Sequence, residues 1–247
     1  MMKKFLALIF STMISFSAAQ ADELTVAFLS DVPPFGFVKD GKNTGFDLDV
    51  WSEIAKDLKL DYKPVYMDFV SVIPALQTRS LDVALTSMFI TEPRKQTVDF
   101  SDPYYYSAFG ILVHKDDESV KEPKDLAGKT VAAVTGGTGP MWLKENLPDA
   151  KVALLPNLPN AILEFQSGRA DAVIYDFPTI AYYAQTDGAQ NSRVLKQEVG
   201  ERYEGGIAFP KGSPLVAKVN KTLAAMRADG RYDAVYKKWF GAAPTNN

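Results

Sequence analysis

The 247-residue chain contains no cysteine and a single histidine, His114. The lack of cysteine excludes disulfide bonds and leaves no thiol to carry a lipid. One histidine excludes a histidine-rich metal site. His114 follows an apolar run, Ile111 to Val113, where a strand is expected to end, and we expect a structural role for it. No cofactor is expected.

The sequence also lacks a basic tract. Its formal net charge is −3, and removing residues 1–21 takes away two lysines and no acid, which leaves −5. A mildly acidic chain argues against nucleic acid or an anionic membrane as partner. With 47% hydrophobic and 23% charged residues, the composition is that of a soluble globular protein with one large or two modest domains.

Long apolar runs are absent except at the start of the chain. Lys3 and Lys4 precede an apolar segment, residues 5–16, which serines and a threonine interrupt before the small residues Ala19 to Ala21. The segment could alternatively be a membrane anchor, but it is short for one. Basic residues, an apolar segment and small residues follow one another as they do in a secretory signal. We predict cleavage after Ala21 and a periplasmic location.

The most informative stretch lies between residues 81 and 106. An apolar run, residues 81–85, predicts a buried strand, and Thr86 and Ser87 leave its end. Thr91 is suited to cap a helix whose first turn contains Arg94. A helix start beside a guanidinium is a setting for binding a carboxylate. The alternative is that Arg94 is a solvated charge on a helix surface.

Strands and helices alternate before and after this stretch. The expected elements of the first half are strands 24–29, 62–67 and 81–85 with helices from Phe46 and over 69–77. Those of the second are strands 130–134, 153–155 and 171–175 with helices 141–146 and 160–166. Such alternation is typical of doubly wound α/β units.

The two halves are related in sequence. Residues 73–87 align with residues 162–176 at an offset of 89, which pairs Gln77 with Gln166, Asp82 with Asp171, and Ser87 with Asp176. Ligands of open α/β sheets lie beyond the carboxyl ends of strands. Two facing lobes therefore place Ser87 and Asp176 on opposite walls of one cleft.

The C-terminal segment begins no third lobe. After a strand at 207–209 it carries helices near residues 214–226 and 232–240. We expect it to return to the first lobe, which gives two crossovers, near 104–110 and 203–206. Two parallel linkers make a hinge.

At these residues the chain resembles the periplasmic polar amino-acid-binding proteins of ABC importers (family 3 solute-binding proteins), and among them the glutamine-binding protein. The matching stretches are GFDLDVWSEIAKDLKLDY, MDFVSVIPALQTRSLDVAL, TEPRK with VDFSDPYY, RADAVIYD, GIAFPKGS and YKKWFG. The resemblance implies a type II periplasmic-binding-protein fold. The larger lobe would comprise residues 22–106 and 207–247, and the smaller lobe residues 107–206.

The resemblance also implies a ligand site. The family's grip on the α-carboxylate falls on Arg94, with backbone N–H groups near Phe89 and Thr138. Its grip on the α-ammonium falls on Asp176, with oxygens at Thr86 and Ser87, and an aromatic wall falls on Phe69. Taken alone, Asp176 could be a turn residue at a strand end, and Phe69 a core residue.

The chain departs from the glutamine-binding protein where that protein contacts the substrate amide. Leu29 and Val134 stand at the positions of its Asp and Lys, and Val32 replaces an aromatic residue. Tyr175 replaces a His, and Phe89 replaces a Thr of the carboxylate site. The ligand is therefore expected to be an amino acid that is glutamine-like or less polar, with Asp31 as a possible acidic substitute.

Three functions remain open at this stage. The first is a monomeric receptor that delivers an amino acid to an inner-membrane ABC permease. The second is an enzyme, since the resemblance extends to a dehydratase of aromatic amino-acid precursors, whose chemistry needs a tuned acid or base in the cleft. The third is a sensory ligand-binding module, usually fused to a membrane span, and none is evident after residue 24. The receptor fits the residues best.

Overall fold

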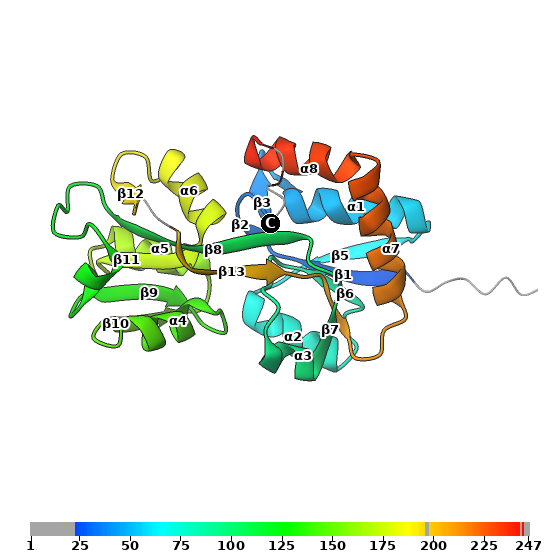
Figure 1. Ribbon diagram of the computed structural model, residues 1–247, viewed down its shortest axis with the longest axis horizontal. Helices are drawn as coiled ribbons and strands as arrows, with labels where there is room; N and C mark the ends of the chain where they lie inside the picture. The colour runs from blue at the N-terminus through cyan, green and yellow to red at the C-terminus, as the bar shows by residue number, and fades with distance from the viewer. Residues whose placement is uncertain (1–22, 196–197, 243, 245–247) are drawn as a thin grey trace, which may run out of the picture.

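The computed structural model describes residues 23–195, 198–242 and 244, and the strands among them form three sheets. Figure 1 shows two α/β halves side by side, with β8 (Tyr105–His114) and β13 (Val199–Gly205) running between them. The predicted signal sequence, residues 1–21, lies outside the described residues.

The first sheet combines strands from distant parts of the chain. Across the sheet the order is β5 (Tyr62–Tyr66), β1 (Leu24–Phe28), β6 (Val83–Leu85), β14 (Ala208–Pro210) and β7 (Val98–Phe100). β1 is parallel to β5 and β6, whereas β14 is antiparallel to β6 and β7. The segment after residue 207 therefore returns to the sheet that contains β1.

Helices cover both faces of this sheet (Figure 1). They are α1 (Phe46–Leu58), α2 (Phe69–Gln77), α3 (Glu92–Thr97), α7 (Leu215–Ala228) and α8 (Arg231–Phe240). The α1, α7 and α8 helices pack against one another, and α2 packs against β6, β7 and β14. The buried face of α1 consists of Phe46, Asp47, Val50, Trp51, Ile54 and Ala55, an amphipathic spacing that includes one acid.

The second sheet lies in the other half. Its order is β10 (Lys151–Leu155), β9 (Thr130–Val134), β11 (Ala172–Asp176), β8 and β12 (Ser192–Val194), with β13 also paired to β8. β9 is parallel to β10 and β11, and β8 is antiparallel to its partners. The helical segments of this half are a 3₁₀ helix (Pro123–Leu126), α4 (Gly139–Asn146), α5 (Leu158–Gln166) and α6 (Phe177–Gln185).

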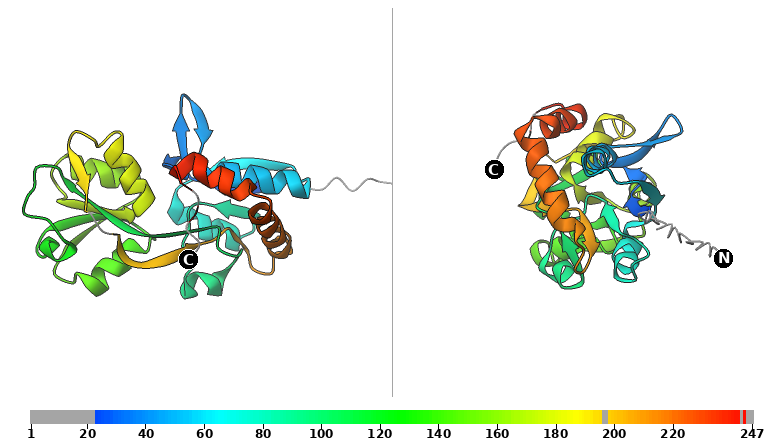
Figure 2. Two further views of the ribbon diagram at one scale, coloured as in Figure 1. Left: turned by 45° about the horizontal axis from the view of Figure 1, so that its top comes forward. Right: turned by 90° about the vertical axis from the view of Figure 1, so that its right-hand side faces the viewer.

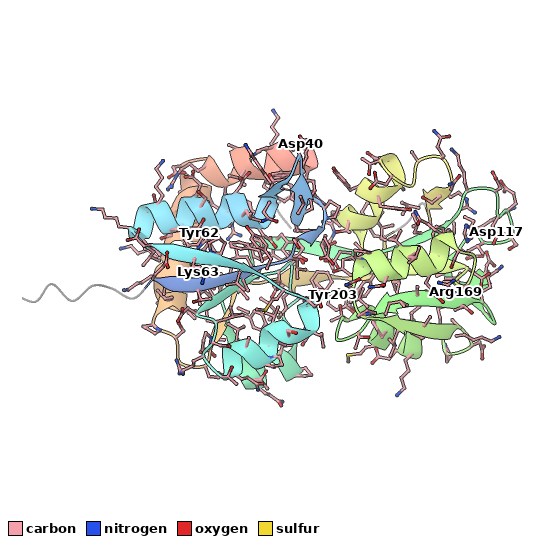
Figure 3. The ribbon with its side chains drawn as sticks, turned by 180° about the vertical axis from the view of Figure 1, so that it is seen from behind. Asp40, Tyr62, Lys63, Asp117, Arg169 and Tyr203 are labelled. Carbon is pink, nitrogen blue, oxygen red and sulfur yellow. The ribbon has the colours of Figure 1, made fainter. Side chains whose placement is uncertain are left out.

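A small meander forms the third sheet. It consists of β2 (Asp31–Val32), β3 (Gly36–Lys39) and β4 (Lys42–Thr44). Asp40 and Gly41 form its tip with φ angles of 52° and 72°, a turn that Asp-Gly favours. The hairpin stands clear of the first sheet (Figure 2), and Asp40 marks its tip in Figure 3.

The 89-residue repeat is present in the fold. The α2 and α5 helices, at residues 69–77 and 158–166, begin and end 89 residues apart. In each half an aspartate precedes a central strand, β6 or β11, and accepts a hydrogen bond from a backbone N–H of the parallel neighbour, β1 or β9. Thr25 N donates to Asp82 Oδ2 at 2.8 Å, and Thr130 N donates to Asp171 Oδ2 at 2.7 Å. The same device therefore fixes the strand register of both halves.

The connecting strands β8 and β13 meet between the halves. Tyr105 pairs with Gly205 in antiparallel register, and a Cβ placed on Gly205 would lie 1.7 Å from the Tyr105 ring. Only glycine lets that ring pass. Tyr203, labelled in Figure 3, lies near this junction and stacks on Phe89 with ring centroids 5.1 Å apart. Over the described part of the chain, none of the helices has the length and apolar character needed to span a bilayer.

Candidate functional site

A cavity that is partly open to solvent lies between the two halves. The first half contributes Phe69, Ser87, Phe89 and Arg94 to its walls. The second half contributes Phe109, Val134, Gly137, Thr138, Gly139, Pro140, Ile174, Tyr175 and Asp176. The cavity therefore sits beyond the carboxyl ends of β6, β9 and β11, where parallel sheets place their ligands.

Seven of the eight residues predicted from the sequence line this cavity: Phe69, Ser87, Phe89, Arg94, Thr138, Tyr175 and Asp176. The eighth, Thr86, does not line it. Thr86 is fully buried, and its hydroxyl has no hydrogen-bond partner among the described residues.

Arg94 reaches the cavity from the first half. Thr91 caps α3, its hydroxyl accepting from Arg94 N at 3.4 Å, as predicted. The guanidinium donates from Nη1 to the Phe89 carbonyl at 2.6 Å and from Nη2 to the Gly136 carbonyl at 2.9 Å. Since Gly136 belongs to the other half, the Arg94 side chain joins the two halves beside the cavity. A guanidinium has further N–H donors, which leaves some for an anion.

The surroundings of Arg94 keep its charge in a confined position. Its side chain is 9% exposed, and its Cζ atom lies 5.2 Å from the centroid of the Phe69 ring. Burial lowers the pKa of Arg94, while the nearby Tyr105 and Asp176 act in the opposite direction. A guanidinium remains protonated under such shifts. The site therefore offers a fixed positive charge.

Asp176 faces the cavity from the end of β11, where it also precedes α6. It is 8% exposed. Burial raises the pKa of Asp176 to about 7, and the Asp47 carboxylate adds to the rise, while the Tyr105 hydrogen bond and Arg94 act against it. A carboxylate with a pKa raised in this way is short of compensating charge. It therefore favours a bound cation.

Tyr105 links the two walls, a role the sequence analysis missed. The centroid of the Tyr105 ring lies 4.8 Å from that of the Phe35 ring. Its hydroxyl, however, donates to the Ser87 carbonyl at 2.5 Å and lies 3.3 Å from Asp176 Oδ2. Because tyrosine serves core and site equally, no sequence pattern distinguished this hydroxyl.

Ser87 has an unusual backbone. Its φ of 46° lies in the left-handed region, which is uncommon for residues other than glycine. Its N–H donates to Asp47 Oδ2 at 3.0 Å, and its carbonyl accepts from Tyr105. Both backbone polar groups of Ser87 are therefore held by side chains from other segments.

The rest of the cavity wall is largely apolar. Phe109, Pro140 and Ile174 line it in addition to the predicted aromatic residues. The strand residues Phe109 and Ile174 were missed because strand periodicity does not separate pocket from core. Val134 lines the cavity, at one of the positions that departs from the glutamine-binding protein. Leu29, at the other, is buried and does not line it.

Asp31 lies outside the residues that line the cavity. It is partly buried, and burial together with the nearby Asp68 raises its pKa. Asp68 accepts a hydrogen bond from Asn157 Nδ2 at 3.4 Å, which joins the N-cap residues of α2 and α5 across the two halves. The acidic side chains here belong to the rim between the halves.

Comparison with known proteins places the chain in a family. A family model described as bacterial extracellular solute-binding proteins, family 3, matches residues 24–242. The ABC transporter glutamine-binding protein GlnH of Bacillus subtilis (strain 168) is 35% identical over 231 residues, which cover 90% of this chain and 83% of that protein.

Solved structures agree with the sequence relatives. An ancestral arginine-binding protein bound to glutamine superimposes with a TM-score of 0.84 at 40% identity, covering 89% of this chain and 98% of the other. The ancestral amino acid-binding protein AncCDT-1, described as a precursor of cyclohexadienyl dehydratase, gives a TM-score of 0.80 at 39% identity, covering 88% and 95%. The type II periplasmic-binding-protein fold is thereby confirmed.

Proposed function

This chain belongs to the bacterial extracellular solute-binding proteins of family 3, and on that premise we propose that it captures an amino acid between its two halves and delivers it to an ABC permease. The glutamine-binding ABC transporter protein among its relatives supports both parts of the proposal. We place the protein in the periplasm as a monomer without a nucleic-acid partner, exported by a signal sequence at residues 1–21.

The observation that carries the proposal is the pair Arg94 and Asp176. They stand on opposite walls of one cavity, each at most 9% exposed, and they have opposite charges. A free amino acid carries a carboxylate and an ammonium on one carbon atom, so it complements both charges at once. The bound head group would then compensate Arg94 and Asp176 without any additional ion.

The carboxylate and the ammonium of the ligand would each have hydrogen-bonding partners in addition to Arg94 and Asp176. Gly137, Thr138 and Gly139 line the cavity at the start of α4, where backbone N–H groups favour a carboxylate next to Arg94. On the ammonium side we assign Ser87 beside Asp176. The hydroxyl of Thr86, next in the chain, has no hydrogen-bond partner among the described residues, and it does not line the cavity.

The charges of the cavity favour a neutral ligand side chain. Arg94 and Asp176 are the cavity-lining residues that carry charge near neutral pH, and the head group uses both. A charged side chain would remain uncompensated among Phe69, Phe89 and Phe109, whereas an apolar or weakly polar one would gain by burial against these rings. We therefore propose a ligand that is glutamine-like or less polar.

We further propose that the two halves act as lobes that close on the ligand. The larger lobe comprises residues 22–106 and 207–247, the smaller one residues 107–206, and β8 and β13 form the hinge between them. The Arg94–Gly136 and Asn157–Asp68 hydrogen bonds join the proposed lobes, which supports a closed arrangement. A ligand that contacts both walls would favour this closed form over an open one.

The protein is a receptor rather than an enzyme. The family is one of solute-binding proteins, and AncCDT-1 is itself described as an amino acid-binding protein. Burial raises the pKa of Asp176 to about 7, a value that would also suit a general acid. A buried carboxylate opposite Arg94 is, however, also the partner that a ligand ammonium group requires.

A thermal-shift screen followed by calorimetry tests the proposal. The panel contains glutamine, glutamate, leucine, phenylalanine and arginine, and a ligand at a hundred times its Kd should stabilise the protein by about 2.7 kcal/mol. Arg94→Ala should abolish the shift. The matched control is Arg169→Ala, because Arg169 is a surface residue paired with Glu164. A ligand-induced shift that survives Arg94→Ala would contradict the assignment.

A further inference from the structure

The first turn of α1 contains two acids with different surroundings. Asp49 accepts from Lys238 Nζ and Trp239 Nε1 near the surface. Asp47 is 1% exposed and accepts from Ser87 N at 3.0 Å and from the Tyr104 hydroxyl at 2.6 Å. A buried carboxylate is costly unless its oxygens are hydrogen-bonded. Asp47 therefore requires both of its donors, and neither donor comes from its own helix.

One of those donors belongs to the cavity wall. Ser87 lines the cavity with its backbone in the left-handed region, which is uncommon for a serine and costs free energy. Asp47 holds its N–H and Tyr105 holds its carbonyl. The two bonds act on opposite sides of one residue, and together they determine which face of Ser87 is turned toward the cavity.

The second donor to Asp47, Tyr104, is adjacent to a residue that contacts Ser87 and Asp176. Tyr104, which donates to Asp47, directly precedes Tyr105, and the Tyr105 hydroxyl lies between Ser87 and Asp176. One carboxylate thus fixes the two chain segments on either side of the position where the ammonium group would bind. Asp47 itself does not line the cavity.

We propose that Asp47 is a positioning residue of the ligand site, holding Ser87 in the left-handed conformation that presents it, beside Asp176, to the ammonium group of an amino acid. The inference rests on the proposed function for its last step, since that step assumes an amino-acid ligand. Its structural step, the constraint of Ser87 by Asp47, stands independently of any ligand.

The structural step is tested without ligand by amide hydrogen exchange, measured residue by residue by NMR. Asp47→Ala should accelerate exchange of the Ser87 amide by about 100-fold or more, while amides of β6 and α1 change by less than about threefold. Asp47→Asn keeps an acceptor and should retain most of the protection. Asp49→Asn is the matched control, because it removes the same charge from the same helical turn without touching Ser87.

Two outcomes of that experiment overturn the proposal. One is an unchanged Ser87 amide in Asp47→Ala. The other is an equal rise across β6, α1 and Ser87, which would make Asp47 a general stabilising residue. If Asp47→Ala does not fold, Tyr104→Phe combined with Asp47→Asn weakens the same constraint while it preserves the shape of the core.

The functional step is tested by calorimetry with L-glutamine and L-phenylalanine. Asp47→Ala should weaken whichever probe binds by about 30-fold or more, and Asp49→Asn by less than about twofold. Ser87→Gly adopts the left-handed conformation without strain, so adding Asp47→Ala to it should cost less than Asp47→Ala costs alone. Equal costs in the two backgrounds would refute positioning through Ser87.

The two proposals fail in different ways. If Arg94→Ala abolishes binding and Asp47→Ala does not weaken it, the proposed function stands and the positioning role is wrong. If neither probe binds, or binding survives Arg94→Ala, the proposed function is wrong as assigned, and the Ser87 amide still decides whether Asp47 constrains the backbone.

Discussion

Ligand binding should release a proton from Asp176, and the affinity should therefore fall as the pH is lowered from 8 to 6. Burial raises the pKa of Asp176 to about 7 in the unliganded site. An ammonium group placed against the carboxylate favours its charged form and lowers this pKa. The ligand binds the ionised form, so protonation competes with binding.

The magnitude follows from the fraction of Asp176 that is ionised before binding. With a pKa of about 7, that fraction is about nine-tenths at pH 8 and about one-tenth at pH 6. The apparent affinity scales with the fraction in the binding-competent form, so it should fall about tenfold, equivalent to about 1.4 kcal/mol. Proton release should rise from about a tenth of a proton at pH 8 to nearly one at pH 6.

Several charged groups surround Asp176 and enter the same balance. Arg94 of α3 lowers its pKa, and Asp47 of α1 raises it. The hydroxyls of Tyr105 and Tyr175 lie nearby, and the pKa of each is raised well above its ordinary value, so both stay neutral between pH 6 and 8. Asp47 has a pKa raised to about 7 by burial and needs its own control.

Calorimetry in two buffers of different ionisation enthalpy measures both the affinity and the protons released. Asp176→Asn is the decisive comparison, since it keeps the side-chain shape and should bind more weakly with a flattened pH dependence. Asp47→Asn removes the second titrating acid, and affinity should still fall with pH, with the midpoint moved to lower pH because Asp47 raises the pKa of Asp176. An affinity that is constant from pH 6 to 8, or one that rises as the pH falls, would refute the assignment of the ammonium to Asp176.

Four other outcomes are expected. Arg94→Ala should cost about 2 to 5 kcal/mol of binding free energy in calorimetry, with Arg169→Ala unchanged, and an affinity within twofold of wild type would exclude Arg94 as the carboxylate ligand. Small-angle scattering should show a smaller radius of gyration on saturation with the ligand that the screen identifies, and an unchanged radius would count against closure. Competition between glutamine, glutamate, leucine and phenylalanine should favour the less polar side chains, and a tenfold preference for glutamine would show the apolar assignment to be wrong. Gly205→Ala should displace the Tyr105 ring and lower both thermal stability and ligand affinity. Wild-type affinity in this variant would show that ligand binding does not depend on the position of the Tyr105 ring.

The fold was largely accessible from the sequence because its signals are repeated and local. The alternation of strands and helices, the amphipathic spacing of α1 and the capping of α3 by Thr91 all depend on residues close together in the chain. The β2–β4 meander was not predicted, since its strands are two to four residues long and mostly polar. Strands that short carry too little alternation to identify.

The sequence predicted most of the residues that line the site, but not the residue that holds one of them in place. Helix starts and strand ends pointed to Arg94 and Ser87, the internal repeat pointed to Asp176, and the resemblance to a known family added Phe69. Asp47 was not identified, because an acid in the first turn of a helix has an ordinary explanation in the helix dipole. Its burial, and its contact with a residue 40 positions along the chain, arise only when α1 packs over the end of β6.

The internal repeat shows where sequence inference stops. It pairs Ser87 with Asp176, and both residues line the same cavity from opposite sides. Equivalent positions nevertheless present different chemistry, since Asp176 offers a carboxylate while Ser87 is turned by a left-handed backbone. That conformation is imposed by Asp47 and Tyr105, which come from outside the aligned segments. A repeat can therefore predict that two residues face one ligand, whereas the orientation of each depends on contacts that are specific to its own half.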